Sequence, residues 1–402
     1  MKIGIIREGK IPPDTRVPLN PTECAQLINK YKVDLLVEPS PTRCFSDAEY
    51  MQAGVPLSAN LEDREILLGV KEVPIHQLIP EKTYFFFSHT IKKQPYNREL
   101  LRAILEKRIH LIDYEVLTDE NGHRIIAFGR FAGMVGAHNA LYTYGKRTGA
   151  FKLARLTDLP SYEVAVKEHY TRLQIPPVKI VLTGTGRVAN GSAEVLRDMG
   201  IAEVSSTEFL ERERFDRPVF TQISSLEYVR RADGKPFQKE DFYREPEAFV
   251  SNFQRYYRQS DIFINGIFWK KGAPAFFTLE EMNTPDFRIR VIADVTCDIA
   301  PEASIPATIK ASTIADPVFG FDPRTGQETE PHQEHVIDMM TIDNLPNELA
   351  RDASTAFGAQ FVAHVMPELV KPHSDMLERA TIAKGGALGK HFQYLQDYVD
   401  GK

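Results

Sequence analysis

Cysteine is scarce in this chain, and its scarcity excludes two kinds of architecture. The 402 residues contain three cysteines, Cys24, Cys44 and Cys297, without a repeated spacing. A disulfide-stapled domain needs paired cysteines and a zinc site needs clustered ones, so we expect reduced, buried thiols and no metal.

The chain also lacks long hydrophobic runs and an excess of positive charge. No stretch approaches the roughly 18 apolar residues of a membrane helix, and the amino terminus is already charged at Arg7, unlike a signal peptide. Lys and Arg total 49 against 55 Asp and Glu, which disfavours a nucleic-acid partner. We therefore expect a cytoplasmic protein that binds neither membranes nor nucleic acids.

Strand-like and helix-like segments alternate along the first third of the chain. A length of 402 residues is comfortable for two domains. Apolar runs predict strands at 1–8, 33–37, 66–70, 83–88 and 110–114, and helical spacing predicts helices at 21–32 and 97–107. Nearly unbroken apolar runs fit strands buried on both faces of a parallel sheet, and the alternation is typical of a doubly wound α/β fold.

A second unit is predicted to open after Gly133. Residues 134–174 are expected to be helical with a polar face, and core strands are expected near 178–183, 262–265 and 291–295. The charged stretch 211–248 is interpreted as surface excursions. The segment 330–335 (EPHQEH) resembles a metal cluster, but it is bounded by proline and has no second cluster, so a solvated loop is the preferred interpretation.

The segment 178–191 combines a strand, a tight turn and a helix start, and fits the dinucleotide fingerprint G-x-G-x-x-G/A. Gly184 permits the turn, Gly186 lets the backbone approach a pyrophosphate, and Ala189 lets the helix pack on the strand. The helix amino terminus then offers free N–H groups to phosphates. The loop, with Arg187 and Val188, is therefore predicted to bind a nicotinamide dinucleotide, NAD(P)H.

The fingerprint usually ends in an acid about 20 residues further on, which binds the ribose hydroxyls. This chain has Val204-Ser205-Ser206-Thr207 at that distance. Ser205 would not repel a 2′-phosphate, and Arg187 is available to pair with one. The pattern favours the NADP form of the coenzyme.

Ionisable residues follow several predicted strands of the first domain. Lys71 and Glu72 come after 66–70, His89 comes after 83–88, and Glu115 comes after 110–114. Arg16 lies in the loop after the first strand. Because the carboxyl ends of parallel strands form the ligand crevice of an open α/β sheet, these side chains are expected to share one site.

Several motifs resemble the alanine dehydrogenase/pyridine nucleotide transhydrogenase superfamily. They are Ile6-Arg7-Glu8 with Arg16-Val17-Pro18-Leu19, the segment 70–74 (VKEVP) and the segment 293–298 (ADVTCD). Within that superfamily the chain is most similar to lysine-forming saccharopine dehydrogenases and to the lysine–2-oxoglutarate reductase half of aminoadipic semialdehyde synthase. The stretches that carry this likeness are 82–94, 110–117, 124–136, 181–188, 341–349 and 381–396.

The resemblance implies two Rossmann-like, doubly wound domains with a cleft between them. A discontinuous substrate domain would comprise 1–133 and 345–402, and a dinucleotide-binding domain 134–344. Lys71 and His89 would be the acid–base pair. The resemblance further implies substrate-binding roles for Arg16, Arg124, Glu72, Glu115 and Asp298, and cofactor contacts from Asp294, Asp343 and Asn344.

The implied reaction is the NAD(P)H-dependent condensation of L-lysine with 2-oxoglutarate to saccharopine, or its reverse. Alanine dehydrogenase chemistry, with pyruvate and ammonia, is an alternative, and a non-catalytic nucleotide-binding protein is another. The presence of Lys71, His89 and Asp298 together argues against the latter. The sequence leaves open the oligomeric state, a homodimer included, and the physiological direction.

Overall fold

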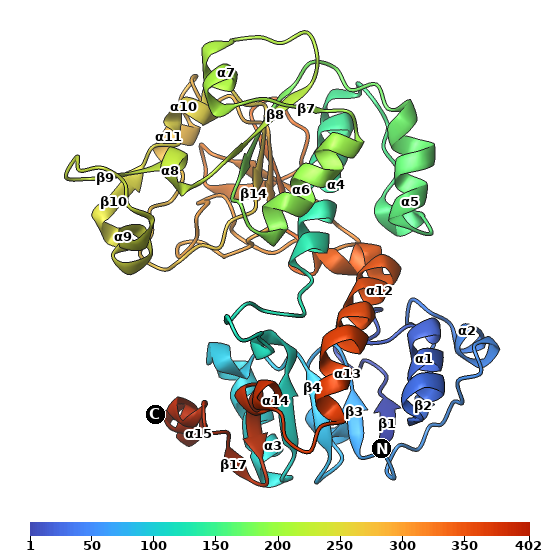
Figure 1. Ribbon diagram of the computed structural model, residues 1–402. Coiled ribbons are helices and arrows are strands. Elements are labelled where there is room, and N and C mark those ends of the chain that lie inside the picture. Colours follow the sequence, from blue (N-terminus) through green and yellow to red (C-terminus); the bar gives the residue numbers. More distant parts are fainter. The chain divides into compact units, whose positions relative to one another are not determined.

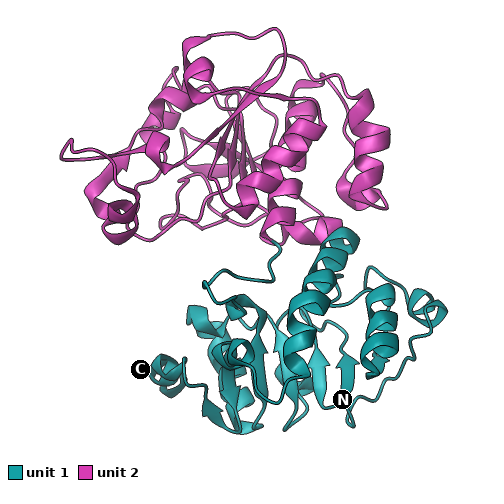
Figure 2. Cartoon of the chain, in the orientation of Figure 1, with its two compact units in different colours: residues 1–128, 350–402 teal, residues 129–349 magenta.

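The computed structural model describes residues 1–402, which form two compact units (Figures 1 and 2). Unit 1 comprises residues 1–128 and 350–402, and unit 2 comprises residues 129–349. These limits differ slightly from the predicted boundaries because helix α4 begins at Gly129 and helix α12 at Ala350. The assignment of substrates to one unit and coenzyme to the other stays a prediction.

Unit 1 contains a seven-stranded sheet in the order β17-β16-β5-β4-β3-β1-β2. The strands β1 to β5 are parallel, and β16 and β17 extend the sheet in antiparallel fashion. The five strands predicted from apolar runs are confirmed. The strands are β1 Lys2–Ile5, β2 Asp34–Val37, β3 Ile66–Leu68, β4 Thr83–Phe86, β5 His110–Asp113, β16 Thr381–Lys384 and β17 Ala387–Leu388.

Helices cover both faces of this sheet, as a doubly wound fold requires. Side chains alternate across β4, so that Phe85 joins the hydrophobic cluster under α1 and α12, while Tyr84 and Phe86 join the cluster under α3 and α15. The helices are α1 Pro21–Tyr31, α2 Asp47–Gln52, α3 Arg98–Glu106, α12 Ala350–Gln360, α13 Met366–Leu369, α14 Asp375–Arg379 and α15 Gln396–Asp400.

Unit 2 contains an eight-stranded sheet in the order β14-β13-β15-β12-β11-β6-β8-β7. Six strands from β15 to β7 run parallel, and β13 and β14 are antiparallel. The strands are β6 Lys179–Thr183, β7 Ala202–Glu203, β8 Val219–Ile223, β11 Ile262–Asn265, β12 Val291–Asp294, β13 Val318–Asp322, β14 Gln327–Thr329 and β15 Ile337–Met340, with a separate ribbon of β9 Val229–Arg231 and β10 Phe249–Ser251.

The helices of unit 2 correct one expectation. The stretch 134–174 is not one polar-faced helical region, because α4 is largely buried and ends before Gly149, whose φ of +66° breaks the helix. The helices are α4 Gly129–Thr148, α5 Tyr162–Val164, α6 Arg187–Asp198, α7 Ser206–Glu211, α8 Ser225–Tyr228, α9 Lys239–Arg244, α10 Gln254–Tyr257 and α11 Leu279–Met282.

The stretch 211–248 is also not entirely a surface excursion, and this prediction was wrong. It contains β8, which pairs with β6 along its whole length. Val219, Phe220 and Ile223 are fully buried. The strand is short and flanked by charged residues, so a count of aliphatic side chains over the whole stretch did not detect it.

Helices α4 and α6 approach each other so closely that only glycine fits at their crossing. A Cβ atom on Gly133 would lie 1.8 Å from the carbonyl oxygen of Val188, and one on Gly191 would lie 2.1 Å from that of Arg130. The Ser192 hydroxyl donates to the Gly133 carbonyl at 2.8 Å. This contact fixes the amino-terminal turns of α6, which follow the glycine loop.

No helix of the protein combines the length and the apolar character needed to cross a membrane. All three cysteines are free thiols.

Candidate active site

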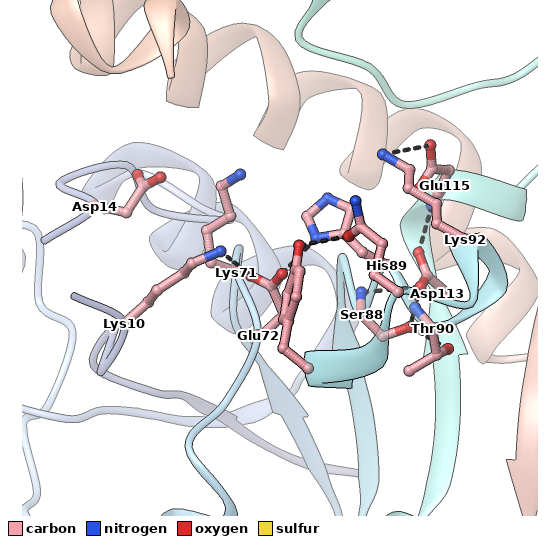
Figure 3. A network of polar contacts seen from close by, with 12 residues as sticks. Lys10, Asp14, Lys71, Glu72, Ser88, His89, Thr90, Lys92, Asp113 and Glu115 are labelled. Atoms are coloured by element: carbon pink, nitrogen blue, oxygen red, sulfur yellow. Dashed lines mark hydrogen bonds and ion pairs between the residues drawn. The ribbon is translucent and has the colours of Figure 1, made fainter. Parts of the chain in front are cut away.

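The charged residues predicted at strand ends do gather at one edge of the sheet in unit 1. The strands β1, β3, β4 and β5 are neighbours and parallel, so their carboxyl ends lie along the same edge. Figure 3 shows Lys71, Glu72, His89 and Glu115 extending from these ends.

Lys71 projects from the end of β3 and makes no hydrogen bond or ion pair through its ammonium group in the structure. Its backbone N–H donates to Glu8 Oε2 at 2.9 Å, and the neighbouring Val70 N–H donates to Glu8 Oε1 at 2.6 Å. Burial, together with the nearby charge of Arg16, lowers the pKa of Lys71. A larger fraction of neutral amine is therefore available than for a solvated lysine.

Glu72 lies between His89 and Lys10. Its Oε1 contacts Nδ1 of His89 at 2.6 Å, and its Oε2 accepts from Nζ of Lys10 at 2.8 Å. Burial acts to raise the pKa of Glu72, but the hydrogen bond and charge of His89 and the bond from Lys10 outweigh it and lower that pKa to about 2. Because Glu72 holds Nδ1, the other ring nitrogen, Nε2, is the one that His89 presents to a ligand.

His89 has a backbone conformation that L-residues rarely adopt. Its φ of 54° and ψ of 10° lie in the left-handed region, although it is not glycine. Such a conformation costs about 1–3 kcal/mol and persists only when surrounding contacts determine it. The ring stacks on Phe87, with centroids 6.4 Å apart. This strain at the predicted acid–base residue is typical of a functional site.

Arg16 is buried in unit 1 and forms a two-point pair with Asp14. Its Nε donates to Asp14 Oδ1 at 2.9 Å and its Nη2 to Asp14 Oδ2 at 2.5 Å. The guanidinium also lies 4.2 Å from the centre of the Phe128 ring. Burial opposes ionisation of Asp14, but the charge and hydrogen bonds of Arg16 lower its pKa. Arg16 thus acts on Lys71 through its charge, and its substrate-binding role stays a prediction.

The predicted pair of Arg124 and Glu115 is assembled on the other side of His89. Nη1 of Arg124 lies 3.7 Å from Glu115 Oε1, and Nζ of Lys92 lies 3.8 Å from the same oxygen. The guanidinium of Arg124 lies 5.5 Å from the centre of the Phe87 ring, on which His89 also stacks. The side chains of Arg124 and His89 therefore both contact the ring of Phe87.

Sequence reasoning missed several members of this cluster, which are Glu8, Lys10, Asp14 and Lys92. They lie in the segments that follow β1 and β4. Charge alone was the available signal, and it does not distinguish a buried partner from a solvated neighbour.

The glycine loop of unit 2 has the geometry that a pyrophosphate needs. Gly184 has a φ of +104°, and a Cβ on it would lie 2.7 Å from the carbonyl oxygen of Gly266. At Gly186 a Cβ would meet no atom within 4 Å, so open space lies beside the backbone. Helix α6 starts at Arg187, with Val188 and Ala189 in its first turn, and directs its N–H groups to that side. The residues present fit a bound dinucleotide.

The sheet order places Ser205 beside the outer strand of unit 2. The strand beside β6 is β8, and β7 lies one position further out. Ser205 follows β7 and caps α7 by accepting from the Glu208 N–H at 3.1 Å. The strand tip next to the glycine loop is therefore at Ile223 and Ser224. A contact of Ser205 with the coenzyme stays a prediction.

The remaining predicted residues lie at the carboxyl ends of β12 and β15 in unit 2. Asp294 is fully buried and accepts from Asn265 Nδ2 at 2.9 Å and from Thr308 Oγ1 at 2.6 Å; burial raises its pKa. Its carboxylate also accepts from the backbone N–H groups of Thr296 and Cys297, in the loop that carries Asp298. Asp343 and Asn344 follow β15, the strand next to β12. Their contacts with a ligand stay predictions.

Relatives with curated names cover most of this chain. The alpha-aminoadipic semialdehyde synthase of Arabidopsis thaliana is 28% identical, over 98% of this chain and 41% of its own length. This chain therefore spans less than half of that protein. The lysine-forming, NAD(+)-dependent saccharopine dehydrogenase of Neurospora crassa is 28% identical, over 85% of this chain and 84% of its own length.

A solved L-alanine dehydrogenase has the same fold. It superimposes with a TM-score of 0.69 at 17% identity, covering 100% of this chain and 99% of that one. The structural likeness shows a fold of two Rossmann-like units, and the relatives support the class of oxidoreductases. Residues 4–135 match the family model described as the alanine dehydrogenase/PNT N-terminal domain.

Replacement of Gly186 tests the coenzyme loop. Gly186→Val is expected to fold normally, because the space beside this residue is open and its φ of −88° is allowed for valine. The branched side chain would occupy the space beside the backbone, so coenzyme affinity should fall at least about tenfold, or 1.4 kcal/mol. Fluorescence titration with NADH and NADPH measures this, and unchanged affinity for both would remove the loop from the coenzyme site.

The ion pair of Glu72 should appear in the pH dependence of stability. The pKa of Glu72 is lowered from 4.5 to about 2 in the folded chain. Its contribution is therefore complete above pH 4.5 and is lost as the pH falls towards 2, and at neutral pH it is on the order of 3 kcal/mol. Urea unfolding of Glu72→Gln should show a stability deficit at pH 7 that narrows below pH 4.5.

The matched control for this measurement is Glu62→Gln, which removes an exposed carboxylate from the same unit. Its deficit should be small at every pH. A deficit in Glu72→Gln that stays constant down to acid unfolding would contradict the ion-pair interpretation.

Proposed function

We propose that this chain catalyses the NAD(P)-dependent reductive condensation of L-lysine with 2-oxoglutarate to saccharopine, or the reverse reaction. The observation that carries the proposal is the cluster of Lys71, Glu72 and His89. It combines a buried lysine of lowered pKa with a histidine fixed through Nδ1 by a carboxylate. Similarity to saccharopine dehydrogenases and aminoadipic semialdehyde synthases supports the choice of substrates.

The chemistry needs two proton-transfer groups. A free amine of pKa about 10.4 must lose its proton before it attacks a ketone, and the hydroxyl that leaves on imine formation must gain one. Lys71 is suited to accept the first proton because its pKa is lowered. His89 is suited to exchange a proton through Nε2, since Glu72 occupies Nδ1. The nicotinamide coenzyme supplies or accepts the hydride.

The cations of the cluster match a substrate with several carboxylates. Arg16, Lys92 and Arg124 belong to the same strand-end region as Lys71. Saccharopine carries three carboxylates, whereas alanine and pyruvate carry one each. Charge-assisted bonds from arginine suit dicarboxylates, so this number of cations favours the larger substrate.

The tip of β8 bears on the form of the coenzyme, because it lies beside the glycine loop. Gln222 donates to the Gly184 carbonyl at 2.9 Å, and Ser224, two residues on in extended backbone, lies on the same face. Glu227 Oε2 accepts from the Ser224 N–H at 2.7 Å and from its hydroxyl at 2.6 Å. A carboxylate at this tip binds ribose hydroxyls and repels a 2′-phosphate, so we propose that NAD(H) is preferred over NADP(H).

Variants of the acid–base pair test the reaction. Lys71→Met and His89→Gln should each lower turnover of lysine plus 2-oxoglutarate by roughly 10²–10⁴, as expected for loss of a general acid or base. Each should also remove one limb of the pH–rate profile, while coenzyme affinity changes little. Stopped-flow measurement of NAD(P)H absorbance and a coenzyme titration separate the two effects.

The same assay distinguishes the alternatives. Purified protein with both coenzymes should be tested on saccharopine, on lysine plus 2-oxoglutarate, and on pyruvate plus ammonia. Turnover of pyruvate and ammonia alone would assign alanine dehydrogenase chemistry instead. Coenzyme binding without turnover of any pair would favour the non-catalytic alternative.

Glu227→Gln tests the coenzyme preference. Glutamine keeps the capping contact with Ser224 but removes the charge, so affinity for NADPH relative to NADH should rise roughly tenfold, or about 1.4 kcal/mol. Ser205→Asp is the matched control, because it adds a carboxylate beside the outer strand β7 and should leave the ratio unchanged. Tighter binding of NADPH than NADH by the unmodified protein would contradict the proposal.

A further inference from the structure

A single buried carboxylate connects the two loops that carry His89 and Glu115. Asp113 ends β5 and is completely buried. Its Oδ2 accepts from the Ser88 N–H at 2.9 Å and from the Ser88 hydroxyl at 2.5 Å, and its Oδ1 accepts from the Glu115 N–H at 2.7 Å. Figure 3 shows these contacts beside the His89 ring.

The contacts of Ser88 continue past His89. The Ser88 and Thr90 hydroxyls lie 2.8 Å apart, and the Thr90 N–H donates to the Ser88 hydroxyl at 3.3 Å. Both residues are fully buried. His89 is therefore held on either side by neighbours that depend on Asp113, and this is the place where the backbone takes its left-handed conformation.

The second oxygen of Asp113 acts on the other half of the site. It fixes the backbone N–H of Glu115, which starts the turn after β5. The Glu115 carboxylate faces Arg124 and Lys92. One side chain thus fixes the backbone next to His89 and the backbone of Glu115, whose carboxylate lies between Lys92 and Arg124.

We propose that Asp113 is a positioning residue. It holds the backbone around His89 in its left-handed conformation and fixes the backbone position of Glu115. This inference rests on the function proposed above for His89. Asp113 itself does not contact the reacting atoms. Its removal should therefore change the orientation of His89 rather than the identity of the proton-transfer groups.

Asp113→Asn keeps the size of the side chain but places an amide donor against the donors of Ser88 or Glu115. Turnover should fall about 10- to 100-fold, while coenzyme affinity stays within about twofold of that of the unmodified protein. The limb of the pH–rate profile that His89→Gln removes should be displaced. The His89 Cε1–H resonance, assigned with His89→Gln, should shift or broaden.

Two further variants test the role of Asp113 if Asp113→Asn folds poorly. Ser88→Ala retains the Ser88 and Glu115 N–H contacts of Asp113, and should show the same changes to a smaller degree. Asp338→Asn removes a buried carboxylate of unit 2 that pairs with Arg147 and His332, and should lower stability without moving the His89 signal.

The outcomes separate this inference from the proposed reaction. A displaced His89 resonance in Asp113→Asn supports positioning even if the chain turns over a different substrate pair, because the resonance is measured without substrate. An unchanged resonance and pH profile in both Asp113→Asn and Ser88→Ala, with turnover reduced only in proportion to folded protein, would assign Asp113 a structural role and overturn the inference.

Discussion

The need to pair buried charge is the constraint on which the site in unit 1 depends. Parallel strands bring four strand ends to one edge, and the charged groups there lose much of their contact with water. A buried charge without a partner is expensive. Arg16 therefore pairs with Asp14, and Glu72 is held between His89 and Lys10. Lys71, which has no such bond, responds by a lowered pKa, and this response makes it suitable as a proton acceptor.

The glycine loop of unit 2 depends on the close approach of backbone segments. The glycines at the crossing of α4 and α6 let two helix backbones meet, and this contact orients the helix start that follows the glycine loop. Gly184 accepts a conformation that other residues avoid, while Gly186 leaves space beside the backbone. The proposed affinity for a dinucleotide would thus come from backbone N–H groups and from the absence of side chains, in contrast with the side-chain chemistry proposed for unit 1.

Much of the site was predictable because strands, and the charged residues directly after them, can be recognised from a few consecutive residues. The apolar runs of β3, β4 and β5 were confirmed as strands, and the charges directly after them were placed at a shared edge. The fingerprint around Gly184 was recognisable for the same reason. The partners Asp14, Lys10 and Asp113 were not assigned, because a carboxylate or amine in a loop has the same sequence signal whether it is solvated or buried. The strain at His89 has no sequence signature, since it is imposed by contacts of its neighbours.

The sequence by itself determined the strand-and-helix alternation, the glycine loop, and the residue types at the strand ends, because each depends on a few consecutive residues. Only the tertiary structure decided which strand lies beside β6. The first strand after the loop helix, β7, takes the outer position, and β8, hidden in a charged stretch, takes the inner one. Strand order depends on hydrogen bonding and burial between segments that are distant in the sequence. For this reason the proposed contact with the coenzyme ribose lies near Ser224 and Glu227 and not near Ser205.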